Sequence, residues 1–164
     1  MAQLYIGIVG HMSSGKSTLS KKLVNRFKFN RVSGDAFRHF ISDNIAYFAN
    51  LDISFPNDRT KLIQPLLHDY RLGISNILLD QGEHVMFDGT SMYAEVRTSR
   101  FKEVKKLYPK VTTVLIFVDT PEELILSRLK ERDTLSEQSN WVEHYHKLKK
   151  PQFEVPTSNE ADAV

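Results

Sequence analysis

The sequence predicts an α/β fold in three layers, with a central parallel sheet of four or five strands between layers of helices. Short apolar segments alternate with longer segments in which apolar residues recur at helical spacing, a pattern typical of parallel sheets covered on both faces. With 164 residues, of which 41% are hydrophobic, the chain has the size of one domain with its own core. We therefore expect residues 1–164 to form a single domain.

Composition narrows the classes of function. The chain has 22 Lys and Arg against 20 Asp and Glu, and the resulting net charge of +2 does not by itself indicate binding to nucleic acid or a membrane. Cysteine is absent, which excludes disulfides, thiolate metal sites and a cysteine nucleophile. No apolar segment is long enough to span a bilayer, and the N-terminus lacks the pattern of a signal peptide. We expect a cytoplasmic protein without a membrane partner.

The first strand and helix flank the motif around which the chain is organised. Residues 4–9 are apolar and rich in β-branched side chains, and apolar residues recur at helical spacing from residue 19. Between them, residues 10–18 read Gly-His-Met-Ser-Ser-Gly-Lys-Ser-Thr, which fits the phosphate-loop pattern of glycine, four residues, glycine, lysine and serine. The order strand, phosphate loop, helix follows from these three segments.

Each part of this motif suits a nucleoside triphosphate. The glycines let backbone N–H groups converge on phosphate oxygens at the positive end of the following helix. Lys16 can bridge the β- and γ-phosphates during catalysis, and the hydroxyl of Ser17 can ligate Mg²⁺. We assign no chemistry to His11 or Met12. The expected nucleotide-binding residues are Gly10, Ser13, Ser14, Gly15, Lys16, Ser17 and Thr18.

A second strand is predicted at residues 29–32, and Ser33 and Gly34 interrupt it. Asp35 then suits a helix N-cap, and residues 36–50 carry apolar residues at helical spacing. Capping alone does not account for a carboxylate that follows the second strand. Phosphoryl transfer to a hydroxyl needs a group that accepts the proton, and we assign that role to Asp35.

A long helix is predicted from residue 59 to about residue 79, with Pro65 and Gly73 as sites of a kink. Residues 84–88 read as a short buried strand that ends in a carboxylate, Asp88. This strand is expected beside the first, so Asp88 is a candidate for binding substrate or Mg²⁺.

A helix, the strongest strand and a further helix follow, in this order. The helix is expected at residues 95–108 and the strand at 112–118, after which Thr120 and Pro121 provide the cap and N1 proline of a further helix. Residues 161–164 read as the opening of one more strand. We expect the sheet to lack its final strand or to receive it from residues absent here, which exposes one side of the core at about 25 cal/mol per Å² of apolar surface. Dimerisation or marginal stability should follow.

The order of these features resembles small phosphate-loop kinases, particularly the kinase domain of polynucleotide 5′-kinases and their zeta-toxin-like relatives. The resemblance covers most of the chain and implies a phosphate-loop NTPase fold, similar to nucleoside kinases, with strand order 2-3-1-4-5 and a lid at about 131–141. The motifs that carry it are Asp35-Ala36-Phe37-Arg38, Phe87-Asp88-Gly89-Thr90, Val118-Asp119-Thr120-Pro121 and the stretch from Ser127 to Asp133.

The resemblance also implies roles for single residues. Asp35 would take a proton from the acceptor hydroxyl, and Arg38 would hold a phosphate or other anion of the acceptor. Arg132 or Arg128 would meet the transferring phosphoryl group, and Asp88 would either reach Mg²⁺ through water or orient Arg38. The chain has neither the length for the phosphatase domain of phage-type polynucleotide kinases nor an Asn-Lys-x-Asp guanine signature.

We therefore expect an ATP- and Mg²⁺-dependent kinase that transfers the γ-phosphoryl group to a hydroxyl. The acceptor stays open among a nucleic-acid 5′ end, a nucleoside or nucleotide, a sugar and another small metabolite. A run of aromatic residues is a candidate base-stacking platform, although core packing is the more frequent fate of such residues. A regulatory module that binds ATP without phosphoryl transfer is the alternative class, and it has no need of a carboxylate at Asp35. The aromatic run is Phe37, Phe40, Tyr47, Phe48 and Phe55.

Overall fold

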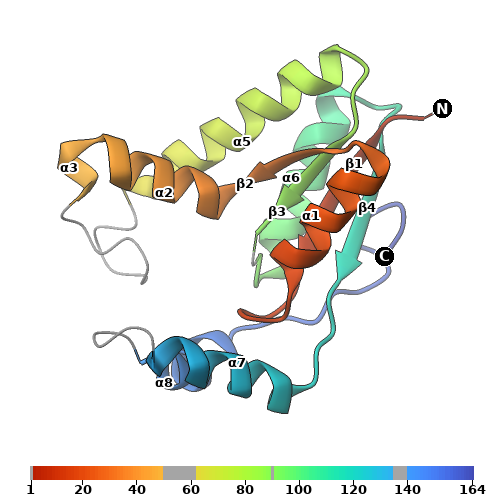
Figure 1. Ribbon diagram of the computed structural model, residues 1–164. Helices are drawn as coiled ribbons and strands as arrows, with labels where there is room; N and C mark the ends of the chain where they lie inside the picture. The colour runs from red at the N-terminus through yellow and green to blue at the C-terminus, as the bar shows by residue number, and fades with distance from the viewer. Residues whose placement is uncertain (1, 50–61, 90, 135–139) are drawn as a thin grey trace.

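The described strands form one sheet in which every strand is parallel to its neighbours (Figure 1). The computed structural model describes residues 2–49, 62–89, 91–134 and 140–164. The strands are β1 (Leu4–Val9), β2 (Asn30–Ser33), β3 (Val85–Asp88) and β4 (Thr112–Phe117). The helices are α1 (Lys16–Phe27), α2 (Gly34–Asn44), α3 (Ala46–Ala49), α5 (Ile63–Asp80), α6 (Ala94–Leu107), α7 (Glu122–Thr134), α8 (Trp141–His144) and the π-helix η1 (Tyr145–Lys149).

The sheet order is β2-β3-β1-β4, which agrees with the first four positions of the expected order. The chain reverses its direction of winding at β1, because β3 lies on one side of this strand and β4 on the other. Ligands of open α/β sheets bind beyond the carboxyl end of the strand at such a reversal. The phosphate loop follows β1 at this place.

Helices cover both faces of the sheet, which confirms the three-layer α/β prediction. Successive β1 side chains point to opposite faces, so Tyr5 and Val9 join a core cluster with residues of α5 and α6. Ile6 and Ile8 point the other way and pack with Leu23 of α1. Figure 1 accordingly shows α1 in front of the sheet and α6 behind it.

Several local predictions need correction at helix ends. The N-cap of α2 is Ser33, whose hydroxyl accepts a hydrogen bond from the backbone N–H of Ala36 at 3.3 Å, so Asp35 is not the cap. The helix predicted over residues 36–50 is interrupted at Ile45, where the backbone is extended, and continues as α3. Helix α5 is continuous from Ile63, and Pro65 lies in its first turn, where its missing N–H costs no intrahelical bond.

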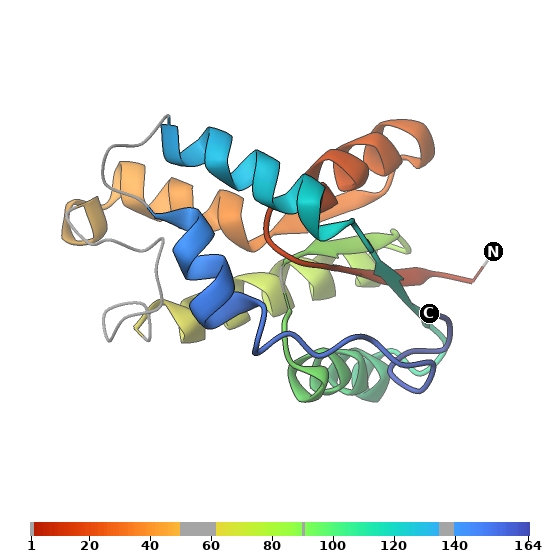
Figure 2. The ribbon, with the colours of Figure 1, turned by 90° about the horizontal axis from the view of Figure 1, so that it is seen from below.

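The described residues of the expected lid are helical except Asn140, which is the N-cap of α8. Residues 131–134 form the last turn of α7 rather than a loop, and α8 begins at Trp141. Asp133 joins the two helices, because its carboxylate accepts hydrogen bonds from the N–H groups of Trp141 at 2.6 Å and Val142 at 3.2 Å. Residues 135–139 of the predicted lid lie outside the described residues. Figure 2 shows α7 and the 141–149 helix on the side where the carboxyl ends of the strands emerge.

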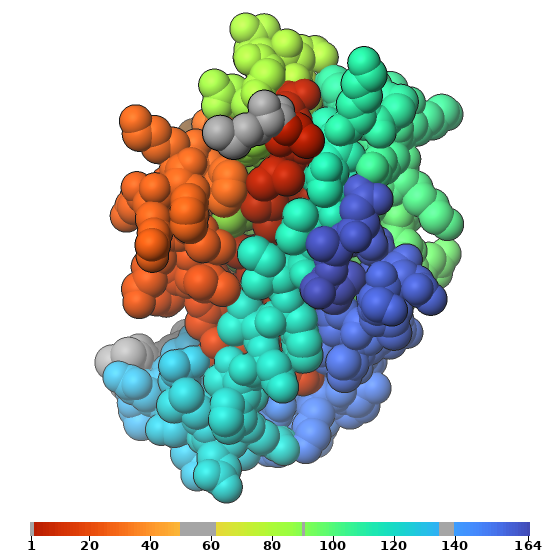
Figure 3. Space-filling view, turned by 90° about the vertical axis from the view of Figure 1, so that its right-hand side faces the viewer, coloured from red at the N-terminus to blue at the C-terminus, as the bar shows by residue number. Residues whose placement is uncertain are grey.

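The C-terminal segment contacts the edge of β4 that faces away from β1. Ala163 makes a single parallel bridge with Val114, in which the N–H of Leu115 donates to the carbonyl of Ala163 at 2.8 Å. Glu160 anchors the segment through a buried ion pair with Arg97 of α6. Figure 3 shows this segment, in dark blue, between strand β4 and helix α6. No helix in the described ranges has the length and apolar character needed to cross a membrane.

Candidate active site

The loop between β1 and α1 is folded into a compact nest. The N–H of Ser14 donates to the carbonyl of His11 at 3.2 Å, and Ser13 and Gly15 have left-handed φ angles of 57° and 98°. A β-carbon on Gly10 would lie 2.7 Å from the carbonyl oxygen of Val118, so only glycine fits where the loop passes the end of β4. Such a turn of successive backbone N–H groups is a conformation that can bind an anion.

Lys16 begins α1 and is 8% exposed. Its ammonium group donates to the carbonyl of His11 and lies 3.4 Å from the hydroxyl of Ser14, so the side chain is folded over the loop. Burial lowers the pKa of Lys16 to about 8, while the charges of Asp88 and Asp35 act in the opposite direction. Its hydrogen-bond partners are neutral oxygens, which phosphate oxygens can replace.

Asp88 lies at the end of β3, is 4% exposed and takes part in a network with α1 and β2. Its Oδ2 accepts hydrogen bonds from the hydroxyl of Ser20 at 3.0 Å and from Arg31 at 3.0 Å (Nε) and 2.5 Å (Nη2). The cation that Asp88 contacts is therefore Arg31 and not Arg38. These bonds hold the carboxylate against α1 and β2 and do not include Arg38.

The residues around the loop fit Mg²⁺ bound together with a nucleotide. Ser17 is exposed in the first turn of α1, and the bonds from Ser20 and Arg31 to Asp88 all go to Oδ2 and not to Oδ1. Hydroxyl and carboxylate oxygens are ligands that Mg²⁺ prefers. No cluster of three or more acidic or histidine side chains in the described part of the chain could hold a metal alone. Phosphate oxygens would have to complete the coordination.

Two arginines of α7 converge on the phosphate loop from the opposite side. Arg128 donates to the carbonyl of Ser13 at 2.9 Å, and Arg132 lies 3.4 Å from the hydroxyl of the same residue. The guanidinium of Arg132 also lies over the ring of Trp141, 4.3 Å from its centroid. Together with Lys16, these arginines place three cations around the loop.

Asp35 and Arg38 lie on α2, at the edge of the site. Their side chains form an ion pair of 2.6 Å that is open to solvent, since the side chain of Asp35 is 71% exposed and that of Arg38 32%. The charge of Asp35 raises the pKa of Lys16, so the carboxylate lies within electrostatic range of the phosphate loop. Thr18 is exposed in the first turn of α1, beside Ser17.

Sequence comparison identifies the family. The chain matches the family model AAA_33, described as an AAA domain, over residues 6–156. It belongs to this family. The matched range includes every site residue named above, so the AAA_33 domain accounts for the whole site.

One curated relative of this AAA_33 domain is an adenylate kinase from Mesoplasma florum. The two chains are 29% identical over 137 residues, which cover 77% of this chain and 58% of the relative. This chain therefore spans less than two thirds of the length of the relative that it matches.

Solved structures share the fold. A candidate kinase from Chloroflexus aurantiacus J-10-fl has a TM-score of 0.74 at 15% identity, covering 96% of this chain and 83% of its own. A sugar kinase from Janibacter sp. HTCC2649 has a TM-score of 0.64 at 15% identity, and the match covers 99% of this chain and 83% of the sugar kinase. A chain of the Pnkp1/Rnl/Hen1 RNA repair complex has a TM-score of 0.63 at 19% identity, and the match covers 93% of this chain and 47% of the chain in the complex. The comparisons support a phosphate-loop kinase fold and do not single out the polynucleotide 5′-kinase or zeta-toxin-like branch.

The sequence did not reveal three residues of the site. Arg31 belongs to none of the sequence motifs. A signal for its role is that a charged residue in a strand expected to be buried needs a counter-charge. The hydroxyl of Thr120, expected to cap α7, donates to the carbonyl of Ser14 at 2.8 Å and so supports the phosphate loop. The ring of His11 lies 4.1 Å from that of Phe153, and burial lowers the pKa of His11.

The aromatic run divides into packed and exposed members. Phe37 stacks on Tyr70 of α5 with ring centroids 4.3 Å apart, so it belongs to the packing between α2 and α5. Phe40 and Tyr47 are 59% and 68% exposed. Phe55 lies outside the described residues.

Proposed function

We propose that this protein is an ATP- and Mg²⁺-dependent kinase that phosphorylates a hydroxyl group of a small molecule. The observation that carries the proposal is the convergence of Lys16, Arg128 and Arg132 on one phosphate loop, with the exposed carboxylate of Asp35 on the neighbouring helix. Phosphoryl transfer requires cations around the γ-phosphate and a group that accepts the acceptor's proton.

The proposed reaction is an in-line displacement. The acceptor oxygen forms a bond to the γ-phosphorus, the bond from this phosphorus to the β,γ-bridging oxygen breaks, and ADP leaves. Asp35 takes the hydroxyl proton, and Lys16 and the α7 arginines bind the charged oxygens of the transferring group. The hydroxyl of Ser17 and the carboxylate of Asp88 would hold Mg²⁺, and this ion would neutralise phosphate charge when it is bound with ATP.

We also propose that α7 and α8 close over bound nucleotide. Arg132 connects the phosphate loop to Trp141, so contacts that it makes with phosphate would be transmitted to α8. Amide hydrogen exchange in residues 131–134 and 140–144 should slow when ATP and Mg²⁺ are added. Equal exchange with and without ATP would contradict the closure.

A small-molecule acceptor is favoured by the similarity to an adenylate kinase and by the fold shared with a sugar kinase. A polynucleotide 5′-hydroxyl is the second candidate. Phe40 lies on α2, the helix that carries Asp35, and Tyr47 lies on α3. Their exposed rings favour the second candidate, because exposed aromatic side chains can stack on bases. An ATP-binding regulatory module remains the alternative from another class.

The test is an assay with γ-labelled ATP and Mg²⁺ against separate panels of sugars, nucleosides, nucleotides and 5′-hydroxyl oligonucleotides. We expect label in one small-molecule panel and a loss of transfer in Asp35→Asn. Label confined to oligonucleotides would favour the second candidate. Tight ATP binding without label in any panel would favour the regulatory module.

A further inference from the structure

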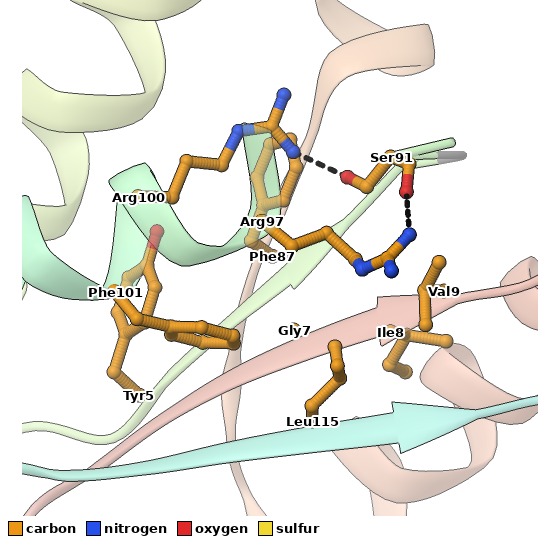
Figure 4. A pocket seen from close by; sticks show the side chains of 10 residues that line it. All are labelled: Tyr5, Gly7, Ile8, Val9, Phe87, Ser91, Arg97, Arg100, Phe101 and Leu115. Carbon is orange, nitrogen blue, oxygen red and sulfur yellow. Dashed lines mark hydrogen bonds between the residues drawn. The ribbon is translucent and has the colours of Figure 1, made fainter. Parts of the chain in front are cut away.

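Ser91 lies in the connection between β3 and α6, and two arginines of α6 hold it in place. Nη1 of Arg97 donates to its carbonyl at 3.0 Å, and Nη1 of Arg100 donates to its hydroxyl (Figure 4). Ser91 has a left-handed φ of 44°, which is unfavourable for a residue other than glycine. Such a conformation persists only when its surroundings hold it, and it is common where ligands bind. The two arginines provide that support.

The two arginines differ in how their charges are neutralised. Arg97 is paired with the buried carboxylate of Glu160, which it meets through Nε at 2.5 Å and Nη2 at 2.8 Å. Arg100 makes no ion pair with any residue in the described part of the chain. Its guanidinium carbon lies 4.7 Å from the centroid of the Phe87 ring. Neither this ring nor the hydroxyl of Ser91 carries a negative charge.

A second cation lies over the ring of Phe87. The guanidinium carbon of Arg71 is 5.9 Å from its centroid, and Arg71 is bonded at 2.7 Å to Glu103, the carboxylate that acts on Arg100. Burial and the charge of Arg71 lower the pKa of Arg100 to about 10. A partly buried guanidinium beside another cation is unfavourable without a counter-charge. An anion bound at Arg100 would supply that charge.

Arg100 and Ser91 can donate hydrogen bonds to the same oxyanion. A serine hydroxyl has one proton and two lone pairs, so Ser91 can accept from Arg100 and still donate to a second oxygen. The planar guanidinium has five N–H donors, which suit two oxygens of a carboxylate or phosphate. Figure 4 shows the second terminal nitrogen of Arg100 pointing away from the other labelled side chains. Both residues are partly buried and line one pocket between α6 and the sheet.

The order of the strands places Arg100 and Ser91 beside the proposed reaction centre. Strand β3 lies between β2 and β1 in the sheet. The connection after β3 therefore begins between the phosphate loop, which follows β1, and α2, which follows β2 and carries Asp35. Ser91 is the third residue after Asp88 in this connection, at the edge of the sheet where ligands of α/β folds bind. A molecule held at Arg100 by its anionic group can present a hydroxyl to this centre.

We propose that Arg100 and Ser91 bind a carboxylate or phosphate group of the acceptor, so that the acceptor is an anionic small molecule. This inference rests on the proposed kinase function. The site is separate from Arg38, whose guanidinium is already paired with Asp35 at 2.6 Å.

The first test measures anion binding without catalysis. The phosphate loop is saturated with Mg²⁺ and a non-hydrolysable ATP analogue, and the protein is titrated with inorganic phosphate or acetate at constant ionic strength, with chloride as the reference. Binding is followed by the rise in melting temperature. Arg100→Gln should weaken binding of the anion about 10- to 100-fold, as expected for the loss of a charged hydrogen-bond donor. Lys102→Gln, which removes a charge from the exposed face of α6, should bind like wild type.

Ser91→Ala keeps the test decisive if Arg100→Gln does not fold, because it removes one hydroxyl and no charge. It should weaken binding of the anion about 2- to 10-fold, as expected for the loss of a neutral hydrogen bond. Unchanged anion affinity in Ser91→Ala, or no stabilisation of wild type by either anion beyond chloride, would overturn the proposal. A loss of anion binding in Arg38→Gln that Arg100→Gln does not share would overturn it as well.

The second test compares acceptors that differ by one anionic group: glucose, gluconate and glucose 6-phosphate, and a nucleoside with its monophosphate. Gluconate separates carboxylate recognition from phosphate recognition. We expect transfer to an anionic member, with a KM that rises about 10- to 100-fold in Arg100→Gln. Equal transfer to the neutral member would reject the anion site and keep the kinase. Anion binding without transfer to any acceptor would reject the kinase and keep the site.

Discussion

The phosphate-loop side and the acceptor side of the site each contain an Arg–Asp ion pair, but the two pairs differ in burial. On the phosphate-loop side, Arg31 is 21% and Asp88 4% exposed. On the acceptor side, Arg38 is 32% and Asp35 71% exposed. The first pair is fixed by the sheet before any ligand arrives, whereas the second is free to rearrange around one. The fold thus builds the proposed donor site, whereas the proposed acceptor site is formed by surface residues.

The largest expected effect comes from the buried side. Lys16→Ala should reduce phosphoryl transfer below detection and strongly weaken ATP binding, because it removes the charge expected to bridge the β- and γ-phosphates. Calorimetric titration with ATP and Mg²⁺ measures the binding. Lys22→Ala changes an exposed lysine of the same helix and should bind ATP normally. Unchanged ATP affinity in Lys16→Ala would contradict the assignment of the phosphate loop.

A smaller but purely kinetic effect is expected on the exposed side. Asp35→Asn should lower kcat by about 10²–10⁴-fold, the usual range for loss of a general base, with ATP affinity nearly unchanged. The control is Asp43→Asn, an exposed carboxylate on the same helix, which should keep wild-type turnover. Turnover of Asp35→Asn within a few-fold of wild type would remove Asp35 from the mechanism.

The same contrast explains what the sequence could predict. The positions of the strands along the chain and the place of Lys16 follow from the hydrophobic pattern and a fixed motif, because both are local features of the sequence. The order of the strands in the sheet is implied only by the resemblance to small phosphate-loop kinases. The partner of Asp88 could not be read from spacing: Arg31 lies 57 residues away, and only the pairing of β2 with β3 brings them together. The helical end of the lid was missed because polar residues after Arg132 resemble a loop, whereas Asp133 is held by the N–H groups of α8.

The two ion pairs should also differ in their contribution to stability. Arg31→Gln removes the ion-pair partner of the buried carboxylate of Asp88, which keeps its hydrogen bond from Ser20, and should cost about 1.5–3 kcal/mol of unfolding free energy. Arg38→Gln removes an exposed pair and should cost less than about 1 kcal/mol. Urea titrations of the two variants beside wild type measure both values. Equal losses would show that burial does not distinguish the two sides.

The smallest expected effect is a pH dependence of ATP binding that belongs to the buried side alone. Without ATP, burial holds the pKa of Lys16 at about 8, and bound phosphate would raise it because a nearby anion favours the charged ammonium. A group whose pKa rises on binding strengthens binding in full below its free-state pKa, and this contribution is lost progressively as pH increases from that value to the higher bound-state pKa. ATP affinity should therefore fall by about tenfold between pH 7 and pH 9, where the protonated fraction of Lys16 drops from most to about a tenth. Lys16→Met has no ammonium to titrate and should give weak binding with a flat profile over this range, whereas Asp35→Asn, which removes a charge that raises the pKa of Lys16, should move the fall in affinity to lower pH. A flat wild-type profile would mean that Lys16 stays charged up to pH 9 and that its burial does not set the ATP affinity.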